Sequence, residues 1–299
     1  MTAASRILSV IAAVLAFGAL RLPLERGLDG ARRAAGLRHD AGLSLSFREQ
    51  MSQASLVAVL GGLRSLVAAL WDLWAAYAWE NTDYAQVEKD YRFCQLLQPR
   101  IFYYWDRGQW MMATMGALFY RNDYADRGAM GSLLYEAFVE KGLQMVKDGQ
   151  RFLPDEVRLY EAEAYIYRER VRPRPFELEA EAWRAARNCP GAPAYTHRFY
   201  AYALAQLPER EEEAERLLTE LYRAQPSPAP STLIALLEVF HWSRLAEEWS
   251  TEQTAYSHLR RIYDASPVFH IPRLISTLKK LEARLGIPPW KSIPVSAGR

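Results

Sequence analysis

The sequence has few of the residues and motifs that mark a catalytic or metal-binding protein. Its 299 residues include two cysteines and five histidines, and none of them stands in the CxxC or HExxH spacing that zinc sites use. The sequence also has no glycine-rich phosphate loop and no nucleophile-elbow motif. It therefore predicts no catalytic residue, no metal ligand and no cofactor, and we expect the protein not to be an enzyme.

Carboxylates do occur close together, at Glu161/Glu163, Glu177/Glu179/Glu181 and Glu211/Glu212/Glu213. Acid–base catalysis needs two carboxylates that lie in different environments within one pocket. These groups stand instead on arginine-rich segments, a pattern typical of a solvated helix surface with i,i+4 ion pairs. An enzyme of unrecognised type is therefore the weakest functional interpretation.

Net charge is also small, because 37 Lys and Arg oppose 35 Asp and Glu. Residues 1–60 carry seven basic and four acidic side chains, so the excess of positive charge lies at the N-terminus. No strip of basic and aromatic residues is present, so we expect no nucleic-acid partner. A basic segment beside an apolar run instead suggests the flank of a membrane segment.

The apolar run extends from Ile7 to Leu20 without a charged side chain, and it reaches Leu24 if Arg21 extends toward the interface. Residues 1–24 fit either an uncleaved membrane anchor or a secretory signal segment. The best cleavage pattern, Ala16-Phe17-Gly18, lies inside the run, which favours the anchor. Residues 25–45 contain four glycines and are typical of a flexible linker.

The side of the membrane on which the helical domain lies stays open. Five arginines come after the apolar run and one precedes it, which by the positive-inside rule predicts a cytoplasmic domain. N-terminal hydrophobic segments with a short basic start nevertheless commonly export the domain behind them, and this favours a periplasmic domain at an inner membrane.

A helical stretch begins near Ser46, and its apolar pattern continues over residues 56–76. Arg64, Asp72 and the Gly61-Gly62 pair argue against a second membrane span, because charges inside a bilayer are costly. We expect a fully buried helix at the start of a soluble core.

The rest of the chain lacks strand signals, and segments rich in Ala, Leu, Glu and Arg show helical spacing instead. Most of these helices end at a Pro-, Gly- or Asx-containing break, among them Asn81-Thr82-Asp83, which can turn the chain and cap the helix that follows. We expect a helical repeat domain over 46–285 and an extended tail over 286–299. The tail either folds back onto the last helices or serves as a docking peptide. The expected helices are 63–80, 84–97, 101–119, 126–148, 155–170, 175–188, 193–206, 209–224, 231–247, 251–265 and 272–285.

Prolines divide these helices into units of repeated length, which close at Pro99, Pro154, Pro190, Pro226 and Pro267. The two middle intervals are equal, the last is slightly longer, and the first is the longest. Periods of this size are typical of helix-pair arrays, in which neighbouring pairs bury one another's apolar faces.

The stretch from Trp71 to Pro99 resembles the tetratricopeptide repeat, whose unit has about 34 residues. Trp71 stands at the motif's first large aromatic position, and Trp74-Ala75 stands at its Leu-Gly pair. Weaker copies end at Pro190, Pro226 and Pro267, whereas segment 101–154 departs from the pattern because its helices are too long. The other matching positions are Ala78, Asp83-Tyr84, Tyr91 and Cys94. As a whole, the chain also resembles membrane-anchored tetratricopeptide-like proteins of bacteria.

This resemblance implies an all-α solenoid of about five antiparallel helix pairs, with a C-terminal capping helix and one preceding N-terminal hydrophobic helix. It also implies a right-handed superhelix whose concave face is formed by the first helix of each pair. Cys94 and Cys189 are interpreted as small buried or half-buried residues, with a single disulfide as the alternative.

By the same resemblance, several first-helix residues should point into the concave groove. Aromatic and acidic side chains together would suit a protein or peptide partner that carries Lys or Arg. Taken singly, each residue also fits a simpler interpretation, since the aromatics could be core and the acids solvated. The candidate groove residues are Asp72, Trp79, Tyr103, Asp106, Trp110, Tyr160, Glu163, Tyr167 and Phe199.

The sequence thus predicts a membrane-tethered scaffold or adaptor for protein–protein interaction. The alternative is a permanent structural subunit of a larger membrane or envelope complex, which should expose large apolar patches. An adaptor should instead show a polar groove with a few aromatic anchors. The sequence does not indicate the partner or the oligomeric state.

Overall fold

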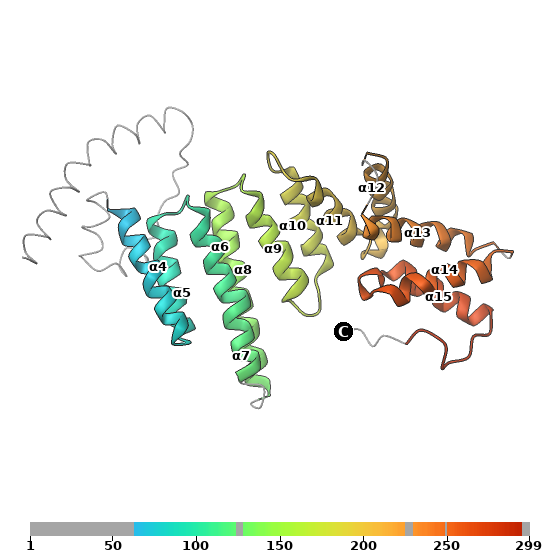
Figure 1. Ribbon diagram of the computed structural model, residues 1–299, viewed down its shortest axis with the longest axis horizontal. Helices are drawn as coiled ribbons and strands as arrows, with labels where there is room; N and C mark the ends of the chain where they lie inside the picture. Colours follow the sequence, from blue (N-terminus) through green and yellow to red (C-terminus); the bar gives the residue numbers. More distant parts are fainter. Residues whose placement is uncertain (1–62, 124–127, 225–229, 249, 295–299) are drawn as a thin grey trace, which may run out of the picture. The chain divides into compact units, whose positions relative to one another are not determined.

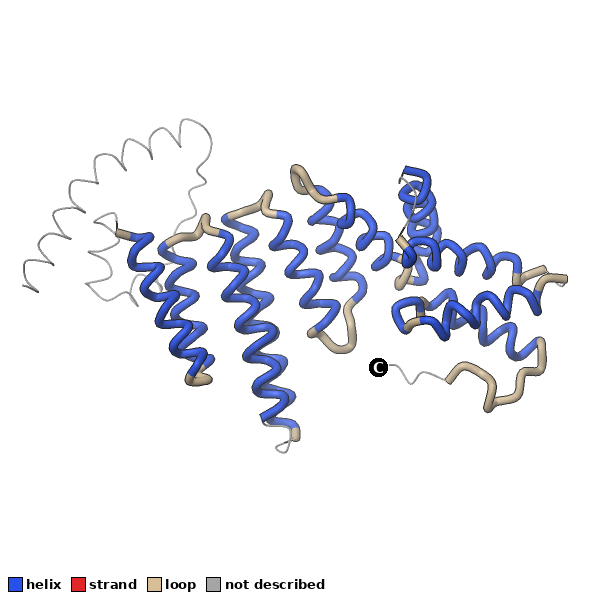
Figure 2. Tube along the Cα trace, viewed as in Figure 1, coloured by secondary structure: helices blue, strands red, loops and turns tan. Residues whose placement is uncertain are grey.

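The computed structural model describes residues 63–123, 128–224, 230–248 and 250–294, and within these ranges it is helical and contains no strand (Figures 1 and 2). The chain divides into two compact units, Met1–Pro154 and Asp155–Arg299. The predicted anchor, linker and first helical residues, 1–62, lie outside the described residues. Of the described helices, none is long and apolar enough to cross a membrane.

The first unit consists of helix pairs in which each element packs on the next along the chain. The first pair is α4 with α5, and the second is a long bipartite helix with α8. That helix comprises α6, a short π-helix named η1, and α7 (Figure 1). The bounds are α4 Arg64–Glu80, α5 Tyr84–Leu97, α6 Phe102–Trp110, η1 Met111–Gly116, α7 Ala117–Asp123 and α8 Ala129–Phe152.

The turn between α4 and α5 is formed by three residues, Asn81-Thr82-Asp83. Thr82 takes a left-handed backbone conformation, with φ at 57°, which reverses the chain after α4. The Asp83 carboxylate then accepts the backbone N–H of Gln86 at 3.0 Å and caps α5. The predicted turn and cap are therefore confirmed.

The core of the first pair contains most of the residues predicted to pack there. Tyr91 and Cys94 are fully buried, and the Trp71 ring lies 4.7 Å from that of Phe93. Trp74 departs from the prediction, since its side chain is 59% exposed. Among the described residues, the full burial expected for the 56–76 stretch is not observed for α4, because one face of this helix is exposed.

Glycines allow the long helix of the second pair to approach α8 closely. A Cβ added at Gly142 would lie 2.5 Å from the Ala113 Cβ, and one at Gly116 would lie 2.7 Å from the Phe138 ring. At contacts this short, a Cβ at either position would force the neighbouring atoms to shift. The π-helical turn lies at this crossing, where Met111, Met112 and Ala113 are fully buried.

The second unit consists of helices that pack on their sequence neighbours. Two short 3₁₀ turns, Pro208–Arg210 and Pro267–Phe269, lie at proline-containing junctions. The expected helix pairs are confirmed to within a few residues at each end, whereas a superhelical solenoid stays a prediction. The helices are α9 Val157–Glu169, α10 Phe176–Asn188, α11 Ala194–Leu204, α12 Glu211–Ala224, α13 Ser231–Leu245, α14 Glu252–Ala265 and α15 Pro272–Arg284.

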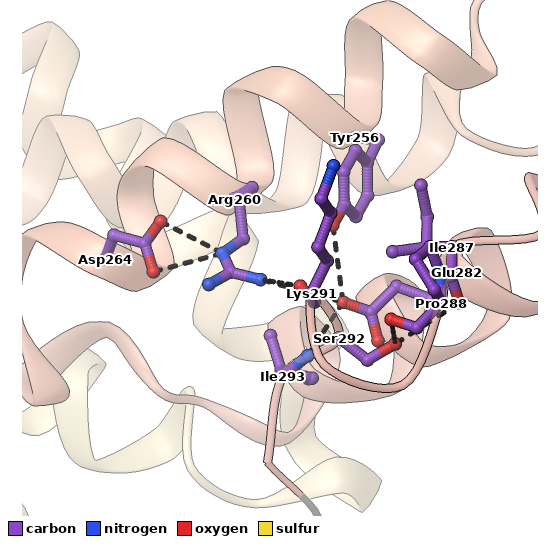
Figure 3. Close-up of polar contacts among 9 residues, drawn as sticks. All are labelled: Tyr256, Arg260, Asp264, Glu282, Ile287, Pro288, Lys291, Ser292 and Ile293. Carbon is purple, nitrogen blue, oxygen red and sulfur yellow. Dashed lines mark hydrogen bonds and ion pairs between the residues drawn. The ribbon is translucent and has the colours of Figure 1, made fainter.

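The described part of the tail folds back onto the last helix pair (Figure 3). Gly286, with φ at +64°, ends α15 as predicted. The backbone N–H of Ile293 then donates to the Glu282 carboxylate at 2.9 Å, and the Ile293 side chain is buried. Arg260 of α14 donates to the Lys291 carbonyl at 2.8 Å, so the tail is held from both helices.

A candidate partner-binding surface

The predicted groove residues divide between the two units. Asp72 and Trp79 lie on α4, and Tyr103, Asp106 and Trp110 lie on α6. Tyr160, Glu163 and Tyr167 lie on α9, and Phe199 lies on α11. Each set is described within its own unit.

In the first unit, the structure brings Asp72 and Tyr103 together. The Tyr103 hydroxyl donates to the Asp72 carboxylate at 3.2 Å and so links α4 to α6, while α5 packs against both helices. Tyr103 keeps 49% of its surface exposed. Partial burial and the neighbouring Asp72 charge both raise the pKa of Tyr103 above its ordinary value, so its hydroxyl stays protonated and remains a donor.

Asp106 and Trp110 continue this surface along α6. Tyr103, Asp106 and Trp110 stand at i, i+3 and i+7, which places them on one side of the helix. Asp106 accepts a hydrogen bond from Gln109 at 3.2 Å, and the Arg107 guanidinium lies 4.8 Å from the centre of the Trp110 ring. We call Asp72, Tyr103, Asp106 and Trp110 the acidic–aromatic strip.

The two carboxylates of the strip, Asp72 and Asp106, are half-buried. Within the part of the chain that the structure describes, no Lys, Arg or His forms an ion pair with Asp72 or Asp106. Trp79 is half-buried and stands at i+7 from Asp72, so it lies on the same side of α4. Partly desolvated acids beside aromatic rings form an environment that favours an incoming guanidinium or ammonium group.

In the second unit, Tyr160, Glu163 and Tyr167 share one side of α9. The Tyr167 hydroxyl donates to the Glu163 carboxylate at 3.3 Å, and the Tyr167 side chain is only 5% exposed. Tyr167 is therefore a core residue that orients Glu163, and only Tyr160 and Glu163 of this set are accessible to a ligand.

Phe199 belongs to a different cluster. Its ring stacks on the buried Trp183 at 4.8 Å, and the Arg168 guanidinium lies 5.7 Å from its centre. Tyr165 also meets Phe199, edge to face. Arg168 and Tyr165 stand on a different side of α9 from Tyr160 and Glu163. The structure thus does not bring Phe199 together with the other three predicted residues.

Sequence reasoning misses the polar partner of this aromatic cluster. The Tyr195 hydroxyl of α11 donates to the Glu161 carboxylate of α9 at 2.7 Å, and this hydrogen bond, together with partial burial, raises the pKa of Tyr195 to about 12. The sequence pattern predicts that Glu161 is a solvated surface residue, but its carboxylate links α9 to α11 through this hydrogen bond. No local sequence signal could have shown this, because the partners stand on different helices far apart in the chain.

One of the three acidic residues on α10, Glu179, is not solvated, contrary to the expectation from the sequence. Glu179 is buried, with 2% of its surface exposed, and Arg174 donates to both of its oxygens at 2.6 and 2.8 Å. Such a bidentate pair fixes the start of α10 and leaves the carboxylate unavailable for acid–base chemistry. Glu177 and Glu181 are exposed as expected.

Neither cysteine is in a disulfide. The Cys94 thiol lies 3.3 Å from the Ala68 carbonyl, and burial raises the pKa of this thiol to about 12, so it stays protonated and unreactive. The described residues contain no group of three His, Cys, Asp or Glu side chains arranged to hold a metal ion.

Comparisons of the chain with protein-family models, with curated proteins and with solved structures find no match in any of the three. The class of protein is therefore defined by the fold alone, as an all-α protein with repeated helix-pair packing that is compatible with a helical repeat.

Proposed function

We propose that this protein is a membrane-tethered scaffold or adaptor that binds a basic segment of a partner protein. The observation that carries the proposal is the acidic–aromatic strip, in which Asp72 and Asp106 form no ion pair with any residue that the structure describes and lie beside Tyr103 and Trp110. Loss of hydration without an ion pair costs a carboxylate free energy, and an arginine or lysine from a partner offsets that cost.

The aromatic residues give the strip its second contribution. Arg side chains stack on aromatic faces, and the Arg107–Trp110 contact is an example within the chain itself. Tyr and Trp are also the residues that most often dominate binding energy at protein interfaces. A partner segment with alternating basic and apolar side chains would use both features of the strip.

The helix order supports the same proposal. The strip lies on α4 and α6, the first helices of two consecutive pairs, and the tetratricopeptide-like repeat presents its binding residues from first helices. The tether is proposed from the uncharged apolar run between Ile7 and Leu20. In this proposal the protein holds its partner at a fixed reach from the bilayer.

The test replaces Tyr103 with the photoreactive amino acid benzoylphenylalanine in the full chain. The variant is expressed in the native cell, and cross-linking is carried out in its membranes. Irradiation should join the protein to a partner whose cross-linked peptide is rich in Lys or Arg. The matched control carries the same group at Glu136, an exposed residue of α8, and should give no such product. Equal cross-linking at both positions, or none at Tyr103, would contradict the proposal.

A permanent structural subunit is the second candidate, and one observation favours it. The outer face of α4 exposes several large apolar side chains, as expected of a surface buried in an assembly. This candidate predicts that the detergent-solubilised protein is recovered only within a larger complex. Recovery as a stable monomer would contradict it.

A further inference from the structure

The outer face of α4 carries the largest group of exposed apolar side chains on any one described helix. Its members stand at i, i+4, i+7, i+8 and i+11, which forms one stripe along the helix. We call this stripe the outer α4 face. It consists of Leu66, Leu70, Leu73, Trp74 and Tyr77, which are 52%, 47%, 65%, 59% and 69% exposed.

The opposite side of α4 is already occupied. Val67, Ala68, Ala75 and Ala78 are buried there, and α5 is the helix that packs against α4. A helix that is apolar on both sides is normally covered on both sides. The outer α4 face therefore requires an occupant, and the described residues do not supply one.

The sequence immediately before α4 has the complementary pattern. Phe47, Met51, Ala54 and Ala58 stand at i, i+4, i+7 and i+11, the spacing also shown by Leu66, Leu70, Leu73 and Tyr77. Gly61-Gly62 separates the two stripes, and a short glycine-containing loop is the usual connection in a helical hairpin.

The two stripes are also in register about Gly62. Each member of one stripe has a counterpart in the other at the same distance along the chain from this glycine, and such residues face each other in an antiparallel helix pair. Small alanines oppose leucines near the turn, and large side chains oppose large ones farther away. From the turn outward, the counterparts are Ala58 with Leu66, Ala54 with Leu70, Met51 with Leu73 and Phe47 with Tyr77.

The described α4–α5 hairpin shows that this chain obeys the same rule. Trp71 and Phe93 are equidistant from Thr82 along the chain, and their ring centroids are 4.7 Å apart. Val67 and Leu97 are also equidistant from Thr82, and they share one core cluster. Trp71 and Phe93 are as far along the chain from Thr82 as Met51 and Leu73 are from Gly62. The same holds for Val67 and Leu97 when they are compared with Phe47 and Tyr77.

We propose that residues 46–60 of the same chain cover the outer α4 face as the first helix of a hairpin that turns at Gly61-Gly62. This pair closes the N-terminal end of the helix array. The outer face is then unavailable to another subunit, while the acidic–aromatic strip on a different side of α4 stays accessible. The proposal does not depend on the proposed function.

Disulfide trapping in the full chain, purified in detergent, tests this proposal. The variants M51C/L73C and A54C/L70C place a cysteine in each stripe at counterpart positions, which facing helices bring within bonding distance. The control S52C/L73C moves one cysteine about 100° around the expected helix. All variants also carry C189S, because Cys189 is only half-buried, whereas the native Cys94 is fully buried and does not compete for the introduced thiols.

Oxidation with copper phenanthroline should join most chains of both test variants through an intramolecular disulfide, seen as an unchanged monomer mass with loss of two thiols. The control should react at least tenfold more slowly. A disulfide-linked dimer would instead assign the face to a second copy of the chain and overturn the proposal. Absence of any disulfide in both test variants would overturn it equally.

A second measurement covers the case in which the new cysteines perturb the fold. The change L70D/L73D should release residues 46–60 and raise the rate of tryptic cleavage after Arg48 at least tenfold. The control E136Q/E140Q, on exposed α8 positions, should leave that rate unchanged. Rapid cleavage after Arg48 in the unsubstituted chain would contradict the proposal.

Discussion

The Tyr103 hydroxyl donates a 3.2 Å hydrogen bond to the Asp72 carboxylate and thereby joins two first helices of consecutive pairs. We propose that the Tyr103 ring is a contact for the partner and that its hydroxyl serves to orient Asp72. Tyr103→Ala should therefore weaken partner binding about tenfold or more, as is typical of an aromatic anchor. Tyr103→Phe should weaken binding less than Tyr103→Ala does, since it keeps the aromatic ring and removes only the hydroxyl that donates to the Asp72 carboxylate. Titrated capture of the cross-linked partner would measure both, and equal losses would contradict this division of roles.

The C-terminal tail should stabilise the last helix pair through Ile293. Ile293 is 4% exposed, so Ile293→Ala should lower the free energy of unfolding of the second unit by about 2–5 kcal/mol. Trp290 stands on the same tail and is 81% exposed. Trp290→Ala should therefore have an effect within about 0.5 kcal/mol. Chemical denaturation would measure the free energy of unfolding of both variants. A larger decrease for Trp290→Ala than for Ile293→Ala would show that the tail packs differently.

The close crossing of α8 with η1 should not tolerate a larger residue at Gly142. Alanine is favoured over glycine within a helix by about 1 kcal/mol. The 2.5 Å contact with Ala113 should nevertheless make Gly142→Ala destabilising by about 1–3 kcal/mol. Adding Ala113→Gly should restore only part of the loss, because the new Cβ would still lie 2.9 Å from the Ala113 backbone nitrogen. A double-mutant cycle by thermal unfolding measures this, and additive losses would contradict it.

Asp90 should make stability depend on pH. Burial raises the pKa of this carboxyl above its ordinary value, while a 2.8 Å hydrogen bond from Gln86 opposes the shift. The folded protein thus binds the Asp90 proton more tightly than the unfolded chain. The ionised carboxylate destabilises the fold at neutral pH, and the cost disappears as pH falls through the raised pKa toward the ordinary value.

Asp90→Asn keeps an oxygen for Gln86 and removes the charge. It should raise the Tm at pH 7, and the gain should shrink as the pH approaches 4. Thermal scans of both proteins across this range would measure the difference. A gain that does not vary with pH would mean that the Asp90 charge is not its cause.

The helix boundaries could be predicted from the sequence because their causes are local. Asp83 caps α5, Gly286 ends α15, and the Pro230 region separates α12 from α13. A local signal can also mislead, as at Ser231. Serine is a frequent helix cap, but the Ser231 side chain makes no capping hydrogen bond and α13 begins at that residue.

The placement of side chains between helices could not be predicted in the same way. Periodicity shows that α9 has aromatic and acidic sides, but not which neighbouring helix each side meets, so the sequence alone groups Phe199 with Tyr160 and Glu163. Glu179 stands in a run of acids typical of a surface, and its burial depends on Arg174 folding back onto it. Such pairings arise from tertiary geometry.

All four residues of the acidic–aromatic strip are nonetheless within reach of sequence reasoning. The repeat resemblance places Asp72 and Tyr103 in the same groove, and the structure shows them in contact. Helix periodicity places Tyr103, Asp106 and Trp110 on one side of α6. The sequence could not show that Asp72 and Asp106 form no ion pair within the described part of the chain, since that depends on every neighbouring helix.

The central claim is that the carboxylates of Asp72 and Asp106 bind a basic partner. The most direct measurement compares equilibrium capture of the cross-linked partner by the full chain and by D72N/D106N, with E136Q/E140Q as a control of equal charge change. We expect D72N/D106N to lose at least tenfold in affinity with an unchanged Tm, while the control binds like the unsubstituted protein. Equal affinity for D72N/D106N and the unsubstituted chain would contradict the claim.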